Sequence, residues 1–257
     1  MMATILVYSL NCRGLADDHK RRQIFNFFQQ TAADIILLQE THTSIKSSRK
    51  YDREWKKLSP KHSSYWNSAT NRSCGVAVLI ADKTTIKYLD SRQDPSGRVM
   101  NVKVQYKGHK LQLQSIYAPT TPEPRPQFFE NLPRYAYPDA TMIMGGDFNM
   151  VENASLDRSG GLITNAHTKG LAALNNFKIQ HSIADVWREK NPGFHQYSWT
   201  SPDLQIHSRL DRFYLSSTLQ NSYIRQDLTH NTWSDHRTVS LYLRFDDKNL
   251  EERGTGN

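Results

Sequence analysis

Short runs of apolar residues recur along the chain, and most of them end on a polar residue. Runs of this length, rich in Val, Ile, Leu and aromatic residues and bounded by turn residues, are typical of buried strands. The pattern predicts strands at residues 5–10, 34–39, 76–80, 86–89, 99–106, 111–117, 142–144, 198–200, 210–215 and 238–245. The segment Lys107–Lys110 is predicted to be a hairpin turn between two of them.

Helical periodicity is confined to a few segments between these strands. Asp17 and Asp18 precede the segment His19–Gln30, whose apolar residues share one helical face, so a capped helix is predicted there. Further helices are predicted at 49–58 and 168–177, and the Pro-rich segment 119–126 is predicted to be a surface loop. Many strands with a few helices indicate an α/β (α+β) fold of two packed sheets with helices outside. Because no repeat or linker interrupts them, residues 1–246 are expected to form one domain, followed by a frayed polar tail at 247–257.

The bulk composition narrows the class of protein. The chain has 257 residues, 37% of them hydrophobic and 11% aromatic, which is too apolar for disorder as a whole. Its net charge of +8 favours a polyanionic partner, nucleic acid before an anionic membrane. Cys12 and Cys74 are interpreted as two free thiols in a reducing compartment, and no secretory signal or long apolar span is visible. The sequence therefore predicts an intracellular protein that is not inserted in a membrane.

Polar residues of unusual chemistry follow several of the predicted buried strands. They are Asn11, Glu40, Tyr117, Asp147, Asn149 and Asp211, together with the run Ser234-Asp235-His236. An unpaired charge inside a buried strand would be costly, whereas at the end of a strand it can project into a shared cleft. Each residue also has a plainer interpretation, as a turn residue, a solvated strand end or a core side chain. Their occurrence together favours a single site.

The residue types in this set indicate metal-assisted hydrolysis of a phosphoester. Glu40, Asp147 and Asp235 offer hard oxygen ligands of the kind that suit Mg²⁺. The chain has no Cys/His cluster with zinc spacing, no phosphate-binding loop of the GxxxxGK type and no Gly-x-Ser-x-Gly elbow. Carboxylates, amides, one tyrosine and one histidine are what attack of water on a phosphodiester requires.

Taken in order, these motifs resemble the endonuclease/exonuclease/phosphatase superfamily. That group includes deoxyribonuclease I, AP endonucleases, neutral sphingomyelinases, inositol-polyphosphate phosphatases, poly(A) deadenylases and LINE retrotransposon endonucleases. The resemblance extends from about residue 5 to residue 243. It implies a four-layered α/β sandwich of two packed, mostly antiparallel sheets flanked by helices, with the site at the top of the two sheets.

The resemblance also implies roles for the residues around the metal and the attacking water. Glu40 matches the principal metal ligand, Asn11 the amide beside the metal, and Asp235 a second carboxylate near it. Asp147 matches the residue that orients and deprotonates the water. The chain departs from AP endonucleases at Arg13, where they carry an acidic residue, which puts a second metal ligand there in doubt.

A second group of residues is matched to the scissile phosphate. Tyr117 matches a phosphate-contacting phenol, and Asn149 matches an amide that binds a phosphoryl oxygen. His236 matches the histidine on the phosphate, and Asp211 matches the aspartate that orients and charges that histidine. Ser234 is a further candidate phosphate contact.

Two motifs favour the LINE-type branch of the superfamily. The segments Asn-Cys-Arg-Gly-Leu at 11–15 and Ser-Arg-Leu-Asp-Arg-Phe-Tyr-Leu-Ser at 208–216 are similar to LINE-type endonucleases, although AP endonucleases share part of the second. Candidate DNA contacts are Arg13, Thr200, Arg209 and Ser234, and, among the other basic residues, Lys20, Arg21, Arg22, Lys46, Arg49, Lys50 and Arg212. The segment 195–200 is expected to influence target choice, because the corresponding region of LINE-type relatives can enter the minor groove.

The leading hypothesis is therefore a Mg²⁺-dependent endonuclease that nicks one strand of duplex DNA to start target-primed reverse transcription of a non-LTR retrotransposon. Mn²⁺ is expected to substitute for Mg²⁺. The resemblance further implies a monomeric domain, fused to a reverse transcriptase in a longer polyprotein and acting in the nucleus. The alternatives are an abasic-site repair endonuclease, a phospholipid or inositol-phosphate hydrolase, and a binding module without activity.

Overall fold

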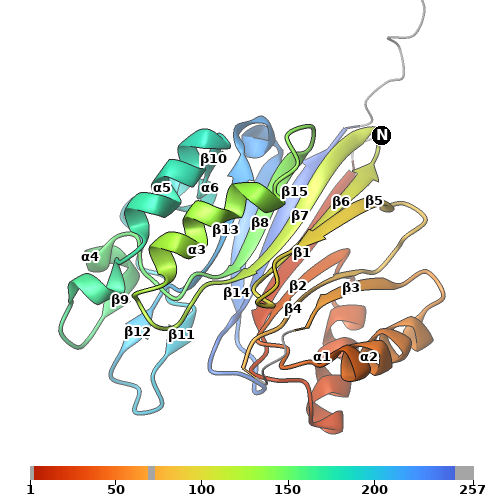
Figure 1. Ribbon diagram of the computed structural model, residues 1–257, viewed down its shortest axis with the longest axis horizontal. Coiled ribbons are helices and arrows are strands. Elements are labelled where there is room, and N and C mark those ends of the chain that lie inside the picture. The colour runs from red at the N-terminus through yellow and green to blue at the C-terminus, as the bar shows by residue number, and fades with distance from the viewer. Residues whose placement is uncertain (1–2, 69–72, 247–257) are drawn as a thin grey trace, which may run out of the picture.

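The computed structural model describes residues 3–68 and 73–246, and two large β-sheets packed face to face form its centre (Figure 1). The first sheet has six strands in the order β14-β15-β1-β2-β4-β3, and the second has six in the order β10-β13-β8-β7-β6-β5. A small third sheet, β11-β12-β9, projects from one end of the second sheet (Figure 1). The predicted tail at 247–257 lies outside the described residues.

The strands and helices have the following bounds. The first sheet contains β1 (Ala3–Asn11), β2 (Ile35–Gln39), β3 (Ser63–Asn67), β4 (Val76–Ile80), β14 (Tyr223–Thr229) and β15 (Thr238–Phe245). The second contains β5 (Lys87–Gln93), β6 (Val99–Tyr106), β7 (His109–Tyr117), β8 (Thr141–Asp147), β10 (Ile183–Ala184) and β13 (Asp211–Ser216). The third contains β9 (Arg158–Ser159), β11 (Trp199–Thr200) and β12 (His207–Ser208). The α-helices are α1 (Asp18–Gln30), α2 (Ile45–Leu58), α3 (Arg125–Asn131), α4 (Ala154–Asp157), α5 (Leu171–Gln180) and α6 (Val186–Lys190), and the 3-10 helices are η1 (Leu132–Tyr135), η2 (Asn165–His167) and η3 (Ser217–Ser222).

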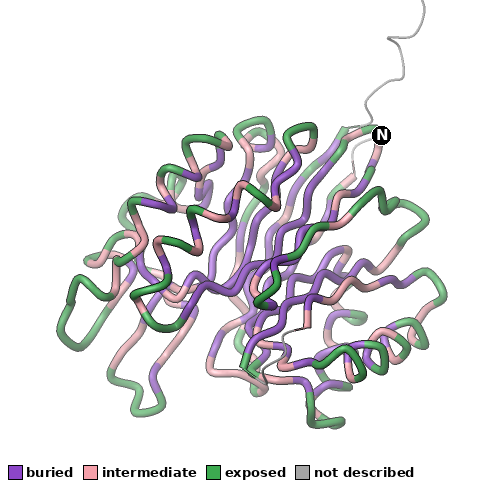
Figure 2. Tube along the Cα trace, viewed as in Figure 1, coloured by how far each residue is buried: buried purple, intermediate pink, exposed green. Residues whose placement is uncertain are grey.

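Three apolar layers hold four structural layers together. Alternate residues of each central strand point to opposite faces, so Val7 lies between the sheets while its neighbour Tyr8 faces α1. Helices α1 and α2 cover the outer face of the first sheet, and α3 and α5 cover the outer face of the second. Strands buried on both faces are continuously apolar, which is why the sequence pattern shows runs rather than alternation. Figure 2 shows this burial along the central strands and the exposure of the outer helices and loops.

The predicted fold class is confirmed, including the mostly antiparallel pairing. Each large sheet contains one parallel pair, β1 with β2 and β7 with β8, and its other ladders are antiparallel. No helix in the described ranges is long and apolar enough to cross a membrane. Both cysteines are buried free thiols, as expected.

The differences from the predicted elements lie mainly at sheet edges and helix starts. Strands β3 and β14 were not predicted, because each is an edge strand with mixed polar composition and weak patterning. Helix α2 begins at Ile45 instead of residue 49, because Ser44 and Ser47 form a capping box there. The loop predicted at 119–126 gives way to α3 at Arg125, since proline is tolerated in the first turn of a helix.

Candidate active site

Strand register brings together residues that are far apart in the sequence. Tyr117 on β7 and Asp211 on β13 both lie opposite Asp147, the last residue of β8. In the other sheet, Asn11 lies opposite Gln39 at the paired ends of β1 and β2, and Glu40 follows directly. These strand ends therefore meet at one edge of the sandwich, the position expected from the sequence.

Asn11 connects the two sheets at this edge. Its side-chain Nδ2 donates hydrogen bonds to Oε1 of Glu40 and to Oδ2 of Asp147, each at 2.9 Å. The residue is fully buried, and the hydroxyl of Ser234 donates to its carbonyl oxygen at 2.7 Å. A single amide thus holds two carboxylates close to each other despite their mutual repulsion.

Asp147, Asp211 and His236 form a buried acidic and imidazole cluster. Nδ1 of His236 lies 2.8 Å from Oδ2 of Asp211, and its Nε2 lies 3.8 Å from Oδ2 of Asp147. Burial by itself would lower the pKa of His236, but the charges of Asp211 and Asp147 outweigh burial and raise this pKa to about 10. Burial raises the pKa of Asp147 to about 7, against the opposing charge of His236. The imidazole is therefore a cation near neutral pH, and Asp147 can accept a proton in that range.

Glu40 remains ionised through its hydrogen bonds. Burial raises the pKa of its carboxyl, but hydrogen bonds from His42, Asn11 and Tyr117 outweigh burial and lower this pKa to about 2. Nε2 of His42 lies 3.4 Å from Oε2 of Glu40. Burial and the charge of Glu40 raise the pKa of the Tyr117 phenol far above its ordinary value, so it stays a proton donor.

Four of the eight non-glycine residues with positive φ in the described ranges lie at the site. Arg13, Glu40, His42 and Asn149 all have positive φ, between 45° and 51°, although none is glycine. Conformations of this kind cost free energy and persist where the surrounding structure enforces them, which is frequent at functional sites. Gly146 also has a required conformation: a Cβ atom there would lie 2.0 Å from the carbonyl oxygen of Ile116.

Some of these groups border an open cavity of about 580 Å³, whereas Asn11, Asp147 and Asp211 are buried and are not part of its lining. Its lining consists of Arg13, Glu40, His42, Ser73, Arg98, Tyr117, Thr120, Asn149, Trp199, Leu210, Asp235 and His236. On one wall, Oδ2 of Asp235 lies 3.0 Å from Nη1 of Arg13 and accepts a hydrogen bond from Nε1 of Trp199, also at 3.0 Å. Tyr117, Asn149 and His236, which come from three different segments, line this cavity together.

The predicted metal ligands are only partly gathered. The carboxylate of Glu40 and the side chain of Asn11 are in direct contact, whereas the carboxylate of Asp235 is paired with Arg13 and Trp199. A separate group, Asp147, Asp211 and His236, has its potential ligand atoms within 4.8 Å of one another. The oxygen donors fit a hard divalent cation beside Glu40.

Several candidate DNA contacts are placed differently from the prediction. Arg209 was expected at the DNA, but only 1% of it is exposed, and its guanidinium lies 2.6 Å from Oδ2 of Asp185. That prediction was wrong, because Arg209 is buried and its positive charge is paired with the buried carboxylates of Asp185 and Asp157. Arg21 and Arg212, which are also fully buried in ion pairs, are corrected for the same reason.

Of the other candidates, Arg13, Thr200 and Ser234 lie at or near the site, whereas Lys20, Arg22, Lys46, Arg49 and Lys50 lie on helices α1 and α2. Arg13 is exposed at the cavity, and Thr200 is partly exposed on β11, where its hydroxyl lies 2.9 Å from Nδ1 of His207. The Ser234 hydroxyl is used to hold Asn11, as described above. Their contacts with DNA stay predictions.

Sequence reasoning missed several residues that border the cavity, among them His42 and Arg98. His42 lies two positions after Glu40 at the same strand end, so its place in the chain could have revealed it. Arg98 carried no such signal, because it sits in the turn between β5 and β6. Its Nη1 donates to the carbonyl oxygens of Tyr117 and Ala118 at 3.2 and 3.3 Å, and only the tertiary structure shows these contacts.

Comparison with known proteins agrees with this architecture. The Xenopus laevis protein described as "Transposon TX1 uncharacterized 149 kDa protein" is 29% identical over 265 residues, which cover 96% of this chain but only 20% of that protein. AP endonuclease LMAP from Leishmania major has the same fold, with a TM-score of 0.76, 17% identity and coverage of 95% of this chain and 88% of that one. The 3' phosphatase NExo from Neisseria, solved with a product DNA hairpin, gives a TM-score of 0.73 at 15% identity, with 92% and 98% coverage. The model of the Endonuclease/Exonuclease/phosphatase family matches residues 7–236, nearly the whole chain, and the protein therefore belongs to that family of phosphoester-cleaving enzymes.

Proposed function

We propose that this protein is a Mg²⁺-dependent DNA endonuclease that nicks one strand of duplex DNA, and that the nick starts target-primed reverse transcription of a non-LTR retrotransposon. The observation that carries the proposal is the continuous hydrogen-bonded set that joins Glu40, Asn11 and Asp147 at the cavity, with His236 and Asp211 beside it. This set contains a proton acceptor, a fixed cation and neutral donors, which hydrolysis of a phosphodiester requires.

Asp147 is assigned the role of general base. Its Oδ1 accepts the backbone N–H of Asn149 at 2.8 Å, and its Oδ2 accepts Nδ2 of Asn11, so the carboxylate is held in one orientation. Because burial raises its pKa to about 7, this carboxylate is a stronger base than an ordinary aspartate and can take a proton from water near neutral pH. A water molecule would transfer a proton to the Asp147 carboxylate as its oxygen attacks phosphorus.

Three neighbouring groups are assigned to the phosphoryl oxygens. Nδ1 of His236 faces Asp211, so its Nε2–H is the cationic donor that remains for the cavity. The Tyr117 phenol stays protonated, and Nδ2 of Asn149 uses one hydrogen on the carbonyl of Ala118 at 2.8 Å, which leaves its second hydrogen. Preorganised donors of this kind stabilise charge that develops in the transition state.

Glu40 is the residue assigned to hold Mg²⁺, because its carboxylate borders the cavity and stays ionised. Asn11, whose Nδ2 donates to that carboxylate, is assigned a place beside the metal. Asp235 is assigned a supporting place near the metal. When bound, the cation would neutralise negative charge on the phosphoryl group. Mn²⁺ prefers the same oxygen-rich ligands and is proposed to substitute.

DNA is the proposed substrate because charge and surface both favour it. The chain has a net charge of +8, and the exposed Arg13 lies at the cavity. Thr200, on the β11–β12 hairpin, and Ser234 are proposed to contact the strand near the nick. The hairpin projects from the same end of the sandwich in Figure 1, where it can reach a groove of the duplex.

The transposon relative supports the biological setting. Because this chain spans only 20% of that protein, we propose that the domain is a part of a longer polyprotein with a reverse transcriptase, acts as a monomer and works in the nucleus. A second candidate function, cleavage at abasic sites, is favoured by the fold shared with an AP endonuclease. The proposed nickase and an abasic-site endonuclease differ in whether they cut an intact duplex.

The deciding experiment is nicking of supercoiled plasmid in Mg²⁺, followed by mapping of the nicks. We expect conversion to open circle that EDTA, Asp147→Ala and His236→Ala each abolish, while circular dichroism shows that both variants stay folded. Clustered nicks would support sequence-guided integration. Rapid cleavage of an abasic duplex without nicking of intact plasmid would replace the proposal with a repair function, and wild-type rates in either variant would refute the assigned roles.

A further inference from the structure

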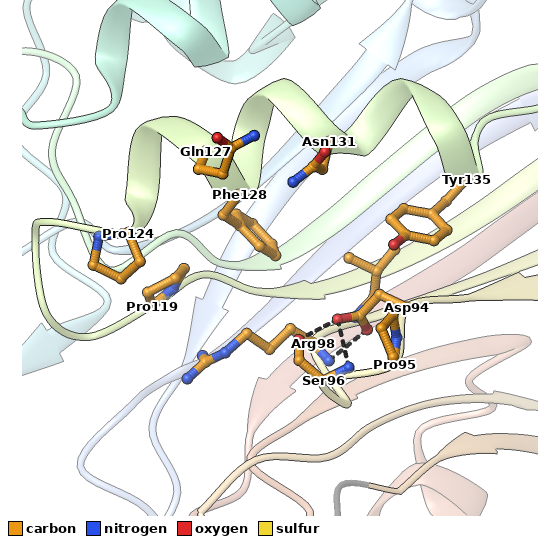
Figure 3. Close-up of a pocket in the computed structure, with 11 residues that line it drawn as sticks. Asp94, Pro95, Ser96, Arg98, Pro119, Pro124, Gln127, Phe128, Asn131 and Tyr135 are labelled. Atoms are coloured by element: carbon orange, nitrogen blue, oxygen red, sulfur yellow. Dashed lines mark hydrogen bonds between the residues drawn. The ribbon is translucent and has the colours of Figure 1, made fainter.

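A second cavity lies beside the active-site cavity. It has a volume of about 300 Å³ and lies between α3 and the turn that joins β5 to β6 (Figure 3). Arg98 lines both cavities, so the second one adjoins the place where the scissile phosphate is proposed to bind. None of the roles proposed above uses this second cavity.

The floor of this cavity is preformed by a buried aspartate. The carboxylate of Asp94 accepts hydrogen bonds from the backbone N–H groups of Ser96, Arg98 and Val99 at 2.7–3.0 Å, and from Nδ2 of Asn67 at 2.9 Å. With its oxygens occupied in this way, Asp94 holds the turn in one conformation. The turn therefore needs no rearrangement to receive a ligand.

The walls combine flat apolar surfaces with unpaired amides. Phe128 and Tyr135 are partly buried aromatic residues, and Pro119 adds an apolar face opposite α3 (Figure 3). Gln127 and Asn131 lie one helical turn apart on α3, and within the described ranges neither side-chain amide has a hydrogen-bond partner. Aromatic faces stack on bases, and amides can donate and accept at a base edge.

Arg98 supplies the link between the two cavities. Its Nη1 is held by the carbonyl oxygens of Tyr117 and Ala118, and its guanidinium lies 5.0 Å from the centre of the Tyr117 ring. In the described part of the chain, its Nε and Nη2 meet no other acceptor. These donors are available for a phosphate between the scissile position and the second cavity.

The geometry points to a nucleobase subsite: one unstacked base of the DNA, next to the nick, enters the cavity formed by Phe128, Asn131 and Tyr135, while Arg98 holds the connecting phosphate. The inference rests on the proposed function, since it assigns a flanking nucleotide to the same DNA. The cavity is at the small end of ligand sites, which suits a single base. A base read in this way would make this wall a determinant of target sequence.

Photo-crosslinking tests the occupancy directly. Duplexes that carry 5-iodouracil at successive positions around the mapped nick are bound to the whole protein in EDTA, irradiated and analysed by peptide mass spectrometry. We expect crosslinks to Phe128 or Tyr135 from one or two adjacent positions only. Crosslinks confined to other residues, in a protein that nicks DNA, would overturn the subsite and leave the proposed function intact.

Nick mapping on duplexes randomised around the cut provides a second readout. Phe128→Ala and Asn131→Ala are each expected to reduce the base preference at one flanking position by at least about five-fold, the equivalent of 1 kcal/mol of stacking or base contact. Glu130→Ala, on an exposed position of the same helix, is the matched control and should keep the wild-type preference. Unchanged preferences in both variants would assign the cavity to another ligand, such as a protein segment, and refute the inference. A protein that neither binds nor nicks DNA would refute the proposed function and the subsite together.

Discussion

The contact between Asp211 and His236 allows the sharpest test of the site. Both residues are buried, and Nδ1 of the ring lies 2.8 Å from Oδ2 of the carboxylate. Asp211→Asn keeps the shape of the side chain and its acceptor oxygen but removes the charge. Because Oδ1 of Asp211 has no hydrogen-bond partner among the described residues, the substitution breaks no other hydrogen bond.

The expected magnitude follows from the value of that bond. A hydrogen bond to a charged group contributes about 1.5–3 kcal/mol, and one pKa unit corresponds to about 1.4 kcal/mol. The pKa of His236, raised to about 10 chiefly by Asp211 and Asp147 against burial, should therefore fall by roughly one to two units. Removing the negative charge favours the neutral ring, so the variant loses its imidazolium at a lower pH than the wild type does. If His236 acts as the cationic donor, the nicking rate should change little at pH 7, where the ring is protonated in both proteins, and the loss should grow with pH toward about 10- to 100-fold above pH 10.

Two measurements check this prediction. NMR of the imidazole in metal-free protein gives the pKa of His236 directly, and the dependence of the nicking rate on pH gives its consequence. Asp139→Asn is the control, because Asp139 forms an exposed ion pair with Lys103 at the opposite end of β8. An unchanged His236 titration in Asp211→Asn, or an unchanged rate near pH 9, would show that Asp211 does not charge the histidine.

Three further outcomes follow from the structure. Chelation with EDTA should abolish nicking while leaving the circular dichroism spectrum unchanged, and readdition of Mg²⁺ should restore it; activity in EDTA would contradict the assigned metal. Gly146→Ala should destabilise the fold by at least roughly 1–3 kcal/mol in urea unfolding, because its Cβ would meet the carbonyl of Ile116, whereas Gly193→Ala, with open space around it, should be nearly neutral. Arg209→Met should lower the free energy of unfolding by about 3–5 kcal/mol, because it leaves the carboxylate of Asp185 unpaired. The variant should keep the wild-type dependence of DNA affinity on salt concentration, and a weaker dependence would instead favour a DNA contact.

Much of the fold was predictable because its signals are local. A strand covered on both faces needs an unbroken apolar run, so the central strands could be identified from these runs in the sequence. The edge strands β3 and β14 escaped because one side of each is unpaired and tolerates polar residues. Helix α3 escaped because prolines at its start look like loop chemistry, although they fit a first helical turn.

The candidate site was predictable for a related reason. Asn11, Glu40 and Asp147 are polar residues placed directly where buried strands end. An unpaired charge buried there would be costly, so their positions indicate a shared cleft in which they find partners. Arg98 had no such position and was found only through its contacts with carbonyl groups of another strand. Arg209 had the right charge and the right neighbourhood in the sequence, and it was nevertheless wrong as a DNA contact, since it is buried against Asp185.

The sequence by itself determined the strand-rich architecture, the residue types of the site and their places at strand ends, because these depend on patterns within a few neighbouring residues. Only the tertiary structure decided that Asn11 joins two carboxylates, that Asp211 lies 2.8 Å from His236, and that a second cavity adjoins the first. Burial, pKa and cavity shape arise from register and packing between segments that are distant along the chain. A charged residue is therefore a surface contact or an interior ion pair according to what the fold places opposite it.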